Sequence, residues 1–369
     1  MENKSREDSQ AIVQSILKNI DHDFSFYSDD NIKTSMQWLE SYECWEYLLR
    51  VLDQRIQNEK IRSESDYLWM AKVFWHYLDD RDKGVNVLRR MVEDLSPDFF
   101  QFHKLVSSQL LLSNDFTDEI ICLEQCEPAF KEKVDHIRCL ERMCLLYEKK
   151  SYDEGKLDAT FKKILSQDPA NLKALRYFKS VYSQMQEWPQ VVNILMQLFD
   201  SSPIVNDKFR IAQEMATVYL YHLDDAKSAI ETLDKLCIGS PLDTTTIRYQ
   251  ANYRLKNWKG CLDILNKYLS SSVSKEKKPV ISFKIGELKE RMELVDEAIA
   301  SYLQCLVFDP GFIDATENLI EIYIEKKDWD GIEHTLDRLS NCLADPSEQQ
   351  RVNEALHRVK SARRGGGFQ

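Results

Sequence analysis

The stretch PVISFKIGELKERMELVDEAIASYLQCLVFDP, residues 279–310, predicts two amphipathic helices joined by a short turn. Apolar side chains recur at helical spacing in both halves, at Ile281, Ile285 and Leu288 and then at Ala298, Tyr302 and Cys305. Gly286 and Ala298 are small, so two antiparallel helices can approach closely where they cross. Pro310 cannot continue a helix and therefore ends the unit.

This helix pair repeats along the chain. A polar residue followed by an aromatic residue opens a segment at Ser151-Tyr152, Glu187-Trp188, Asn257-Trp258 and Asp328-Trp329. The three tryptophans lie 70 and 71 residues apart, which is two units of about 35 residues each time. The closing prolines Pro169, Pro203, Pro241 and Pro310 follow at intervals of 34, 38 and 69 residues. Such a period indicates stacked helix pairs, each in contact with its neighbours.

A second internal match supports repetition. Residues 70–80 read MAKVFWHYLDD, and residues 215–225 read MATVYLYHLDD. The two copies are 145 residues apart, or about four units. Gly84 and Ala229 follow them at the same offset.

The pattern resembles the tetratricopeptide repeat, in which large, small and aromatic residues alternate on two helices and a proline closes the unit. One unit carries the pattern at Leu175, Phe178, Tyr182, Val191, Leu195, Leu198 and Pro203. Val191 replaces the usual alanine, so this pair should sit slightly wider. The resemblance implies an all-α fold, a right-handed α-solenoid of antiparallel helix pairs with about nine units.

The sequence also suggests how the array is bounded. Residues 1–30 are expected to be a polar leader with a capping helix, residues 31–346 the repeat array, and residues 347–362 a capping helix. The serine-rich and lysine-rich stretch at 270–279 suggests a hinge, and residues 363–369 a flexible tail. The tail also suggests a docking segment, although a disordered end is the favoured interpretation.

Composition narrows the class of protein. Hydrophobic residues make up 43% and charged residues 30%, while there are only 10 glycines and 9 prolines, which favours helices joined by short turns. A net charge of −12 and a pI of about 5.2 argue against nucleic acid as the main partner. Neither a signal peptide nor a membrane span is predicted. Nine scattered cysteines favour buried thiols in a reducing, cytoplasmic setting.

Catalytic signatures are lacking. The sequence has no P-loop, Rossmann fingerprint, HExxH or nucleophile elbow. Cys122, Cys126, Cys139, Cys144 and His136 are close in sequence, but a metal site is much less favoured than core packing, because paired zinc cysteines usually lie two apart. Asp79-Asp80 and Asp224-Asp225 fit turns and helix caps. We therefore predict a non-catalytic protein without a cofactor or a metal.

The first helices of the repeats should present the partner-binding residues. The candidates are Arg176, Tyr177, Gln213, Lys284, Glu287, Glu317 and Glu321. This lining is mixed to acidic and departs from the lysine and asparagine clamp with which some tetratricopeptide proteins hold chaperone tails. It instead favours a basic or amphipathic helical segment of a partner.

The leading functional hypothesis is a non-catalytic scaffold or adaptor that binds a peptide or helix of a partner on its concave face. Two alternatives remain open. The chain could be a helical-repeat component of an RNA-processing complex, without direct nucleic-acid contact. It could also be a bacterial peptide-sensing tetratricopeptide regulator, which would need an effector module that residues 1–60 hardly supply.

Overall fold

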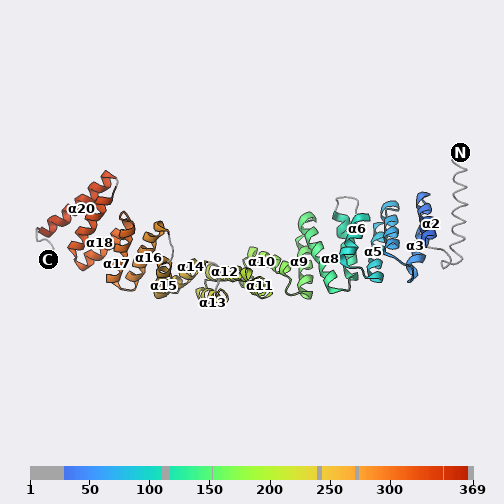
Figure 1. Ribbon diagram of the computed structural model, residues 1–369, viewed down its shortest axis with the longest axis horizontal. Coiled ribbons are helices and arrows are strands. Elements are labelled where there is room, and N and C mark those ends of the chain that lie inside the picture. Colours follow the sequence, from blue (N-terminus) through green and yellow to red (C-terminus); the bar gives the residue numbers. More distant parts are fainter. Residues whose placement is uncertain are drawn as a thin grey trace. The chain divides into compact units, whose positions relative to one another are not determined.

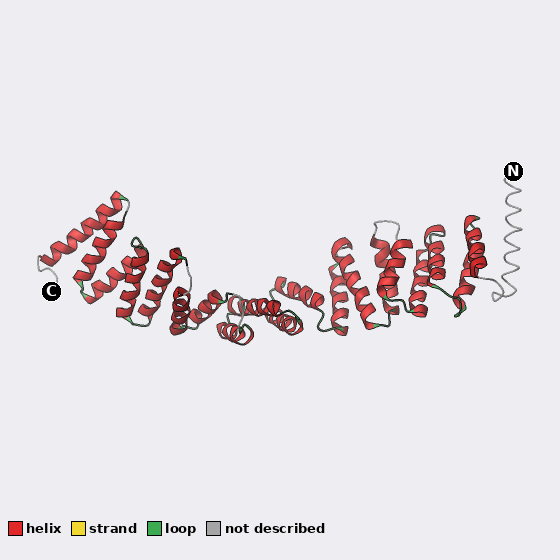
Figure 2. Cartoon of the chain, in the orientation of Figure 1, coloured by secondary structure: helices red, strands yellow, loops and turns green. Residues whose placement is uncertain are grey.

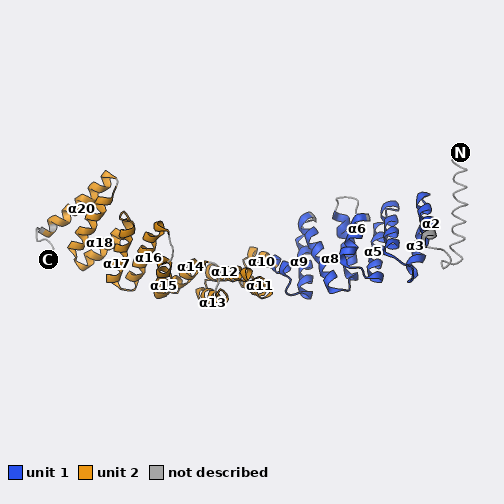
Figure 3. Ribbon diagram, in the orientation of Figure 1, with its two compact units in different colours: residues 1–177 blue, residues 178–369 orange. Residues whose placement is uncertain are grey.

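The structure, a computed structural model, describes residues 29–109, 116–151, 153–238, 243–270, 274–343 and 345–364. Every regular element in these ranges is a helix, and no described residue lies in a strand (Figures 1 and 2). The chain divides into two compact units, residues 1–177 and 178–369 (Figure 3). The predicted capping helix within residues 1–30 lies almost entirely outside the described residues.

The first unit is a row of antiparallel helix pairs. We call the first helix of each pair helix A and the second helix B. The pairs are α2 (Asp29–Ser41) with α3 (Trp45–Gln57), α4 (Glu64–Lys72) with α5 (Arg81–Leu95), α6 (Phe99–Gln109) with α7 (Phe116–Cys126), and α8 (Lys133–Leu146) with α9 (Glu154–Gln167). Short π-helical turns extend α4 (η2, Val73–Tyr77) and α8 (η4, Tyr147–Ser151), and a 3₁₀ turn follows α7 (η3, Glu127–Ala129).

The second unit continues the same arrangement. Helix α10 (Leu172–Gln184) contains the boundary between the units and pairs with α11 (Trp188–Ser201). The pairs that follow are α12 (Val205–Tyr221) with α13 (Ala226–Leu236), α14 (Thr245–Arg254) with α15 (Trp258–Ser270), α16 (Lys278–Arg291) with α17 (Val295–Phe308), and α18 (Ile313–Lys326) with α19 (Trp329–Cys342). A 3₁₀ turn (η5, Lys275–Lys277) precedes α16, and α20 (Pro346–Arg364) packs on α19. The predicted helical-repeat solenoid of about nine pairs is confirmed over the described residues.

The turn from helix A to helix B has one recurrent backbone design. A residue with φ between 51° and 62° lies two positions before helix B in all seven of these turns that are fully described. These residues are Glu43, Asp79, Gln186, Asp224, Lys256, Glu293 and Lys327. The N–H of the next residue donates to a carbonyl five residues earlier in the chain, at 2.8–2.9 Å. In the two stretches that match in sequence, 70–80 and 215–225, the accepting carbonyl is six residues earlier. This is a Schellman-type helix end built without glycine.

The residue after the left-handed position is the N-cap of helix B. Asp80, Asp225 and Asp328 each accept a hydrogen bond from the backbone N–H three residues on, as helix N-caps do. The predicted turn and cap roles of the two Asp-Asp pairs are therefore confirmed. The segment predicted to open at Ser151-Tyr152 begins later, because Asp153 caps α9 and Ser151 ends the π-helical turn.

In two of the described pairs, the tryptophan at the start of helix B stacks on the end of the next helix A. Trp45 stacks on Tyr77, with ring centroids 4.1 Å apart, and Trp188 stacks on His222 at 3.7 Å. Tyr77 and His222 occupy the same position in the two matching stretches found in the sequence. Trp258 instead meets Tyr253 of its own pair edge-on, with ring centroids 5.3 Å apart, and Arg291 at the end of the next helix A lies 5.8 Å from its ring centre.

Small residues set the approach of the two helices within a pair. A Cβ atom built on Gly286 would lie 2.4 Å from the ring of Tyr302, which is fully buried on α17. Ala298 on the same helix is also fully buried. The predicted role of Gly286 and Ala298 at the crossing of α16 and α17 is therefore confirmed.

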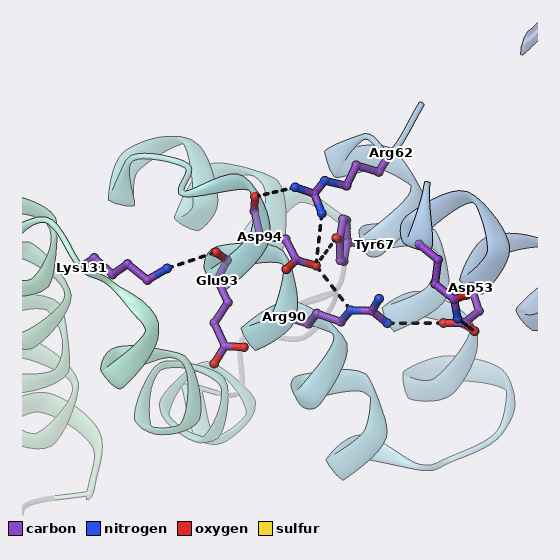
Figure 4. Close-up of polar contacts among 8 residues, drawn as sticks. Asp53, Arg62, Tyr67, Arg90, Glu93, Asp94 and Lys131 are labelled. Carbon is purple, nitrogen blue, oxygen red and sulfur yellow. Dashed lines mark hydrogen bonds and ion pairs between the residues drawn. The ribbon is translucent and has the colours of Figure 1, made fainter. Parts of the chain in front are cut away.

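A polar cluster connects the first two pairs of unit 1 (Figure 4). The buried Tyr67 donates its hydroxyl hydrogen to the carboxylate of Asp94 at 2.6 Å, and Arg90 approaches the same carboxylate at 3.4 Å. Arg62 donates to the backbone carbonyl of Asp94 at 3.3 Å, and Arg90 also reaches Asp53 on α3 at 3.4 Å. Burial and the hydrogen bond to Asp94 raise the pKa of Tyr67. Helices α3, α4 and α5 are thus held together at the end of α5.

The C-terminal part of the array ends on a packed helix. Val352, Leu356 and Val359 of α20 lie against the cluster that contains Ile332 and Leu336 of α19. The helix extends through Arg363 and Arg364, two residues into the predicted tail, and Arg363 pairs with Asp330 and Glu333. Residues 365–369 lie outside the described residues. The hinge at 270–279 stays a prediction, because the division between units falls elsewhere.

The contact between Gly286 and Tyr302 gives a testable prediction. Alanine favours a helix over glycine by about 1 kcal/mol, yet Gly286→Ala should destabilise the pair α16–α17 by about 1–3 kcal/mol because the added methyl group overpacks against a buried ring. Hydrogen exchange of the amides in these two helices measures the change locally. Gly155→Ala on α9 is the control, since its Cβ would meet only Asp153 at 3.5 Å. Equal protection in both variants would contradict the packing argument.

Candidate partner-binding faces

The predicted binding residues are divided between the two units. Arg176 and Tyr177 lie on the part of α10 that belongs to unit 1. The other candidates belong to unit 2, namely Gln213 on α12, Lys284 and Glu287 on α16, and Glu317 and Glu321 on α18. All seven are on helix A of a pair, as predicted. Their role in binding remains a prediction.

Helix α18 presents an acidic stripe. Asp314, Glu317, Glu321 and Glu325 are three or four residues apart, so they share one face of the helix, and all four are exposed. None of them forms a salt bridge within the described residues. Ile324 beside them is 52% exposed. The stripe therefore offers uncompensated negative charge next to apolar surface.

Helix α16 continues the charged surface beside α18. Burial raises the pKa of Glu287, and Asp314 and Glu290 add repulsion, while Arg291 and Lys284 only partly offset these effects. The two cations are themselves held against aromatic rings: Lys284 lies 5.9 Å from the ring centre of Tyr249. A positive group placed near Glu287 would relieve this repulsion.

Gln213 makes its hydrogen bonds within its own helix and to the residues just before the next pair. Its Nε2 donates to the backbone carbonyl of Asp243 at 3.4 Å, and its backbone carbonyl accepts from the Thr217 hydroxyl at 2.8 Å. No recorded contact joins Gln213 to α16 or α18. The structure thus brings Lys284, Glu287, Glu317 and Glu321 onto adjacent helices and leaves Gln213 apart from them.

In unit 1, the two candidates on α10 differ. Tyr177 is half-buried and stacks on Phe161 of α9 with ring centroids 4.4 Å apart, so it is chiefly a packing residue. Arg176 is exposed, and no ion pair is recorded for it among the described residues. Arg176 is therefore the member of this pair that is available to a partner.

The sequence analysis missed a buried acid between two A helices of unit 1. Glu119 of α7 accepts two hydrogen bonds from Arg142 of α8, at 2.6 and 2.9 Å, and lies 2.8 Å from Nε2 of His103 on α6. Burial alone would raise the pKa of Glu119, but the hydrogen bonds and charges of His103 and Arg142 lower it to about 2. The spacing of the three residues in the chain gave no signal of this cluster.

The cysteines near His136 are part of the core. Cys122, Cys126, Cys139 and Cys144 are all buried with free thiols. Contact with Cys122 and burial raise the pKa of Cys126 well above its usual value. His136 pairs with Glu127 instead, and Gln167 approaches its Nδ1 at 2.9 Å. Within the described ranges, no group of three or more His, Cys, Asp or Glu side chains is arranged to hold a metal ion.

Comparisons with known proteins add the following. No family model matches the sequence, and neither does any curated protein. Solved structures of helical-repeat proteins are similar at low identity. The TPR protein YrrB, described as having an unusual peptide-binding site, is 16% identical, covers 53% of this chain and 97% of its own, and gives a TM-score of 0.34. MamA is 16% identical over 48% of this chain and 96% of its own, with a TM-score of 0.33.

Yeast Tom70 is 12% identical over 82% of this chain and 65% of its own, with a TM-score of 0.30. Superpositions this loose carry no functional conclusion. The class of the protein follows instead from its own repeats: it is an all-α array of antiparallel helix pairs, with a small residue at the crossing of α16 and α17 and an aromatic residue at the start of several B helices. None of the helices in the described ranges has the length and apolar character needed to cross a membrane.

Removing the charge of Glu119 should weaken the packing of α6, α7 and α8. Glu119→Gln leaves Arg142 without its anion, and we expect a loss of about 2–3 kcal/mol, since the Arg142 guanidinium is partly solvated. Because folding lowers the pKa of Glu119, this stabilisation should be complete above the ordinary value of 4.5 and be lost as the pH falls toward 2. Urea unfolding followed at several pH values measures both effects. Glu93→Gln, in an exposed pair with Arg89, is the control and should change stability by less than about 0.5 kcal/mol.

Proposed function

We propose that this protein is a non-catalytic interaction scaffold whose A helices in unit 2 bind a basic or amphipathic helical segment of a partner protein. The observation that supports the proposal best is the acidic stripe on α18, formed by Asp314, Glu317, Glu321 and Glu325. Stacked helix pairs present a continuous row of A helices, which is suited to holding an extended partner segment. Because the spacing of these helices is fixed in the fold, the protein loses little conformational entropy when a partner binds.

The chemistry of the stripe favours a particular kind of partner. Four exposed carboxylates along one helix face attract cations and accelerate their encounter with the surface. Exposed Ile324 and the half-buried Phe283 offer apolar contacts near these acids. A helix with cations and apolar residues at spacings of three and four would meet both features at once. Glu287 would gain the counter-charge that it lacks in the free protein.

The remaining functional expectations gain no specific support from the described residues. A cytoplasmic location and the absence of catalysis remain predictions from the sequence. So do the two alternatives, a component of an RNA-processing complex and a peptide-sensing regulator.

A charge-reversal experiment tests the proposed face. The probe is a synthetic, fluorescein-labelled amphipathic helical peptide with lysines on one face and leucines on the other. Glu317→Lys with Glu321→Lys should weaken binding of this peptide about tenfold, equivalent to about 1.4 kcal/mol, and should reduce the dependence on salt. The control is Asp263→Lys with Asp337→Lys, which makes the same change of charge on the B helices α15 and α19. Fluorescence anisotropy measures both.

Equal weakening in the two double variants would mean that net charge, and not the stripe, governs binding, and it would contradict the proposal. Affinity capture of native partners with the same two variants, analysed by mass spectrometry, extends the test to physiological ligands. A partner of the stripe should be retained by the control protein and lost from the stripe variant.

Glu287 should make the affinity for the lysine peptide depend on pH. Since burial raises its pKa, Glu287 takes up a proton at a higher pH than an exposed glutamate does. A bound cation favours the ionised form, so affinity for the lysine peptide should fall as the pH is lowered from 7 to 5. Glu287→Gln should remove most of that fall and leave a weaker, flatter profile. An unchanged pH profile in this variant would show that Glu287 does not meet the peptide's cations.

A further inference from the structure

Unit 1 carries a second face of different chemistry. On α8, Val134, Arg138 and Leu145 follow one another at helical spacing on one side of the helix. Val134 is 59% exposed and Leu145 is 42% exposed. On the neighbouring helix A, Phe100 of α6 is 63% exposed and lies beneath the guanidinium group of Arg138, 4.7 Å from the ring centre. Apolar groups therefore lie on both sides of one cation.

The guanidinium group of Arg138 is held in place before any partner arrives. Asp135 accepts a hydrogen bond from Nη1 of Arg138 at 3.2 Å, and the same carboxylate oxygen accepts from the backbone N–H of Phe99 at 3.2 Å. Asp135 thus connects α8 to the start of α6. Stacking on Phe100 leaves the edge of the guanidinium group free to donate further hydrogen bonds, and a planar fork of this kind matches a carboxylate.

The charge around this pair is positive, in contrast to α18. Lys104 lies one turn after Phe100 on α6, and it forms no recorded ion pair within the described ranges. Arg176 on the next helix A is also exposed and without a recorded ion pair. Glu141 is already paired with Lys173 at 2.8 Å. Helices α6 and α8 and residues 172–177 of α10 together carry six Lys and Arg residues and two acids, Asp135 and Glu141, and both acids are already engaged.

We infer that the face formed by Phe100, Lys104, Val134, Arg138 and Leu145 is a second docking surface, and that it binds an acidic protein segment with apolar side chains on both sides of a carboxylate. The carboxylate would accept hydrogen bonds from Arg138, and the apolar side chains would cover Phe100 and Val134. Exposed aromatic and aliphatic side chains grouped around an ordered arginine are typical of interaction sites.

The arrangement favours an internal Asp or Glu over the free end of a chain. Val134 lies one turn before Arg138 and Leu145 two turns after it, so a segment that covers both must continue past the guanidinium group in both directions. A peptide that ended at Arg138 would leave one of these apolar side chains in water. The inference concerns unit 1 alone and does not depend on the acidic stripe of α18.

The test uses random 12-residue peptides displayed on phage and selected on the full-length protein. The peptides enriched should contain an Asp or Glu flanked by Leu, Ile, Val or Phe. Synthesised and labelled, they should bind Phe100→Ala and Arg138→Glu at least about tenfold more weakly than the original protein. Phe100 is exposed and Arg138 lies at the surface, so both variants should fold, which far-UV circular dichroism and thermal melting check.

Two controls separate this face from the one in unit 2. The variant Glu317→Lys with Glu321→Lys should bind the selected acidic peptides as the original protein does. The same peptides amidated at the C-terminus should keep their affinity, and a loss on amidation would assign the site to a free carboxyl end and overturn the inference. Selection of basic peptides only, of no peptides, or of peptides that bind Phe100→Ala and Arg138→Glu unchanged would also overturn it.

Discussion

The left-handed residue between helix A and helix B is the constraint from which the repeat follows. It reverses the chain so tightly that the residue whose N–H makes the last hydrogen bond to helix A is also the N-cap of helix B. A non-glycine residue in this conformation costs about 1–2 kcal/mol, and the chain accepts that cost at Glu43, Gln186, Lys327 and four equivalent positions. The packing of each pair has to outweigh this cost, so turn and core depend on each other. The turn fixes which residues of helix A and helix B face each other, and so it places the small residue at the crossing and the aromatic residue at the start of helix B.

The sequence predicted the pairs well and the turns only in part. Periodic apolar residues and recurrent tryptophans arise from packing that several helix pairs share, so they repeat in the sequence and can be recognised there. The left-handed positions are occupied by Glu, Asp, Gln and Lys, which share no property that marks them. Glycine would have revealed these turns. The start of α9 was also misplaced, because a π-helical turn at Tyr147–Ser151 moves the cap to Asp153.

The candidate site residues also include some that the sequence could place and some that it could not. Helical spacing was sufficient to place Glu317 and Glu321 on one exposed face, because both lie on a single helix. Spacing was not sufficient for Glu119, whose partners His103 and Arg142 come from two other helices and lie 16 and 23 residues away. Gln213 was grouped with residues that the structure places on other helices, because position within a repeat does not say which repeats contact one partner. Phe100 and Arg138 were missed because their importance arises from a contact between neighbouring A helices.

The opposite charges of the α18 stripe and of the face formed by α6 and α8 have a consequence for how a scaffold selects its partners. A segment attracted to the carboxylates of α18 is repelled by Arg138, Lys104 and Arg176, and an acidic segment is repelled by α18. If both faces bind as proposed, each would exclude the ligand of the other, which is specificity by unfavourable charge as well as by contact. Because the charges lie on the solvent side of helices whose inner sides hold the repeat together, they can differ from unit to unit without disturbing the fold. A repeat array can in this way carry two recognition chemistries on one structural pattern.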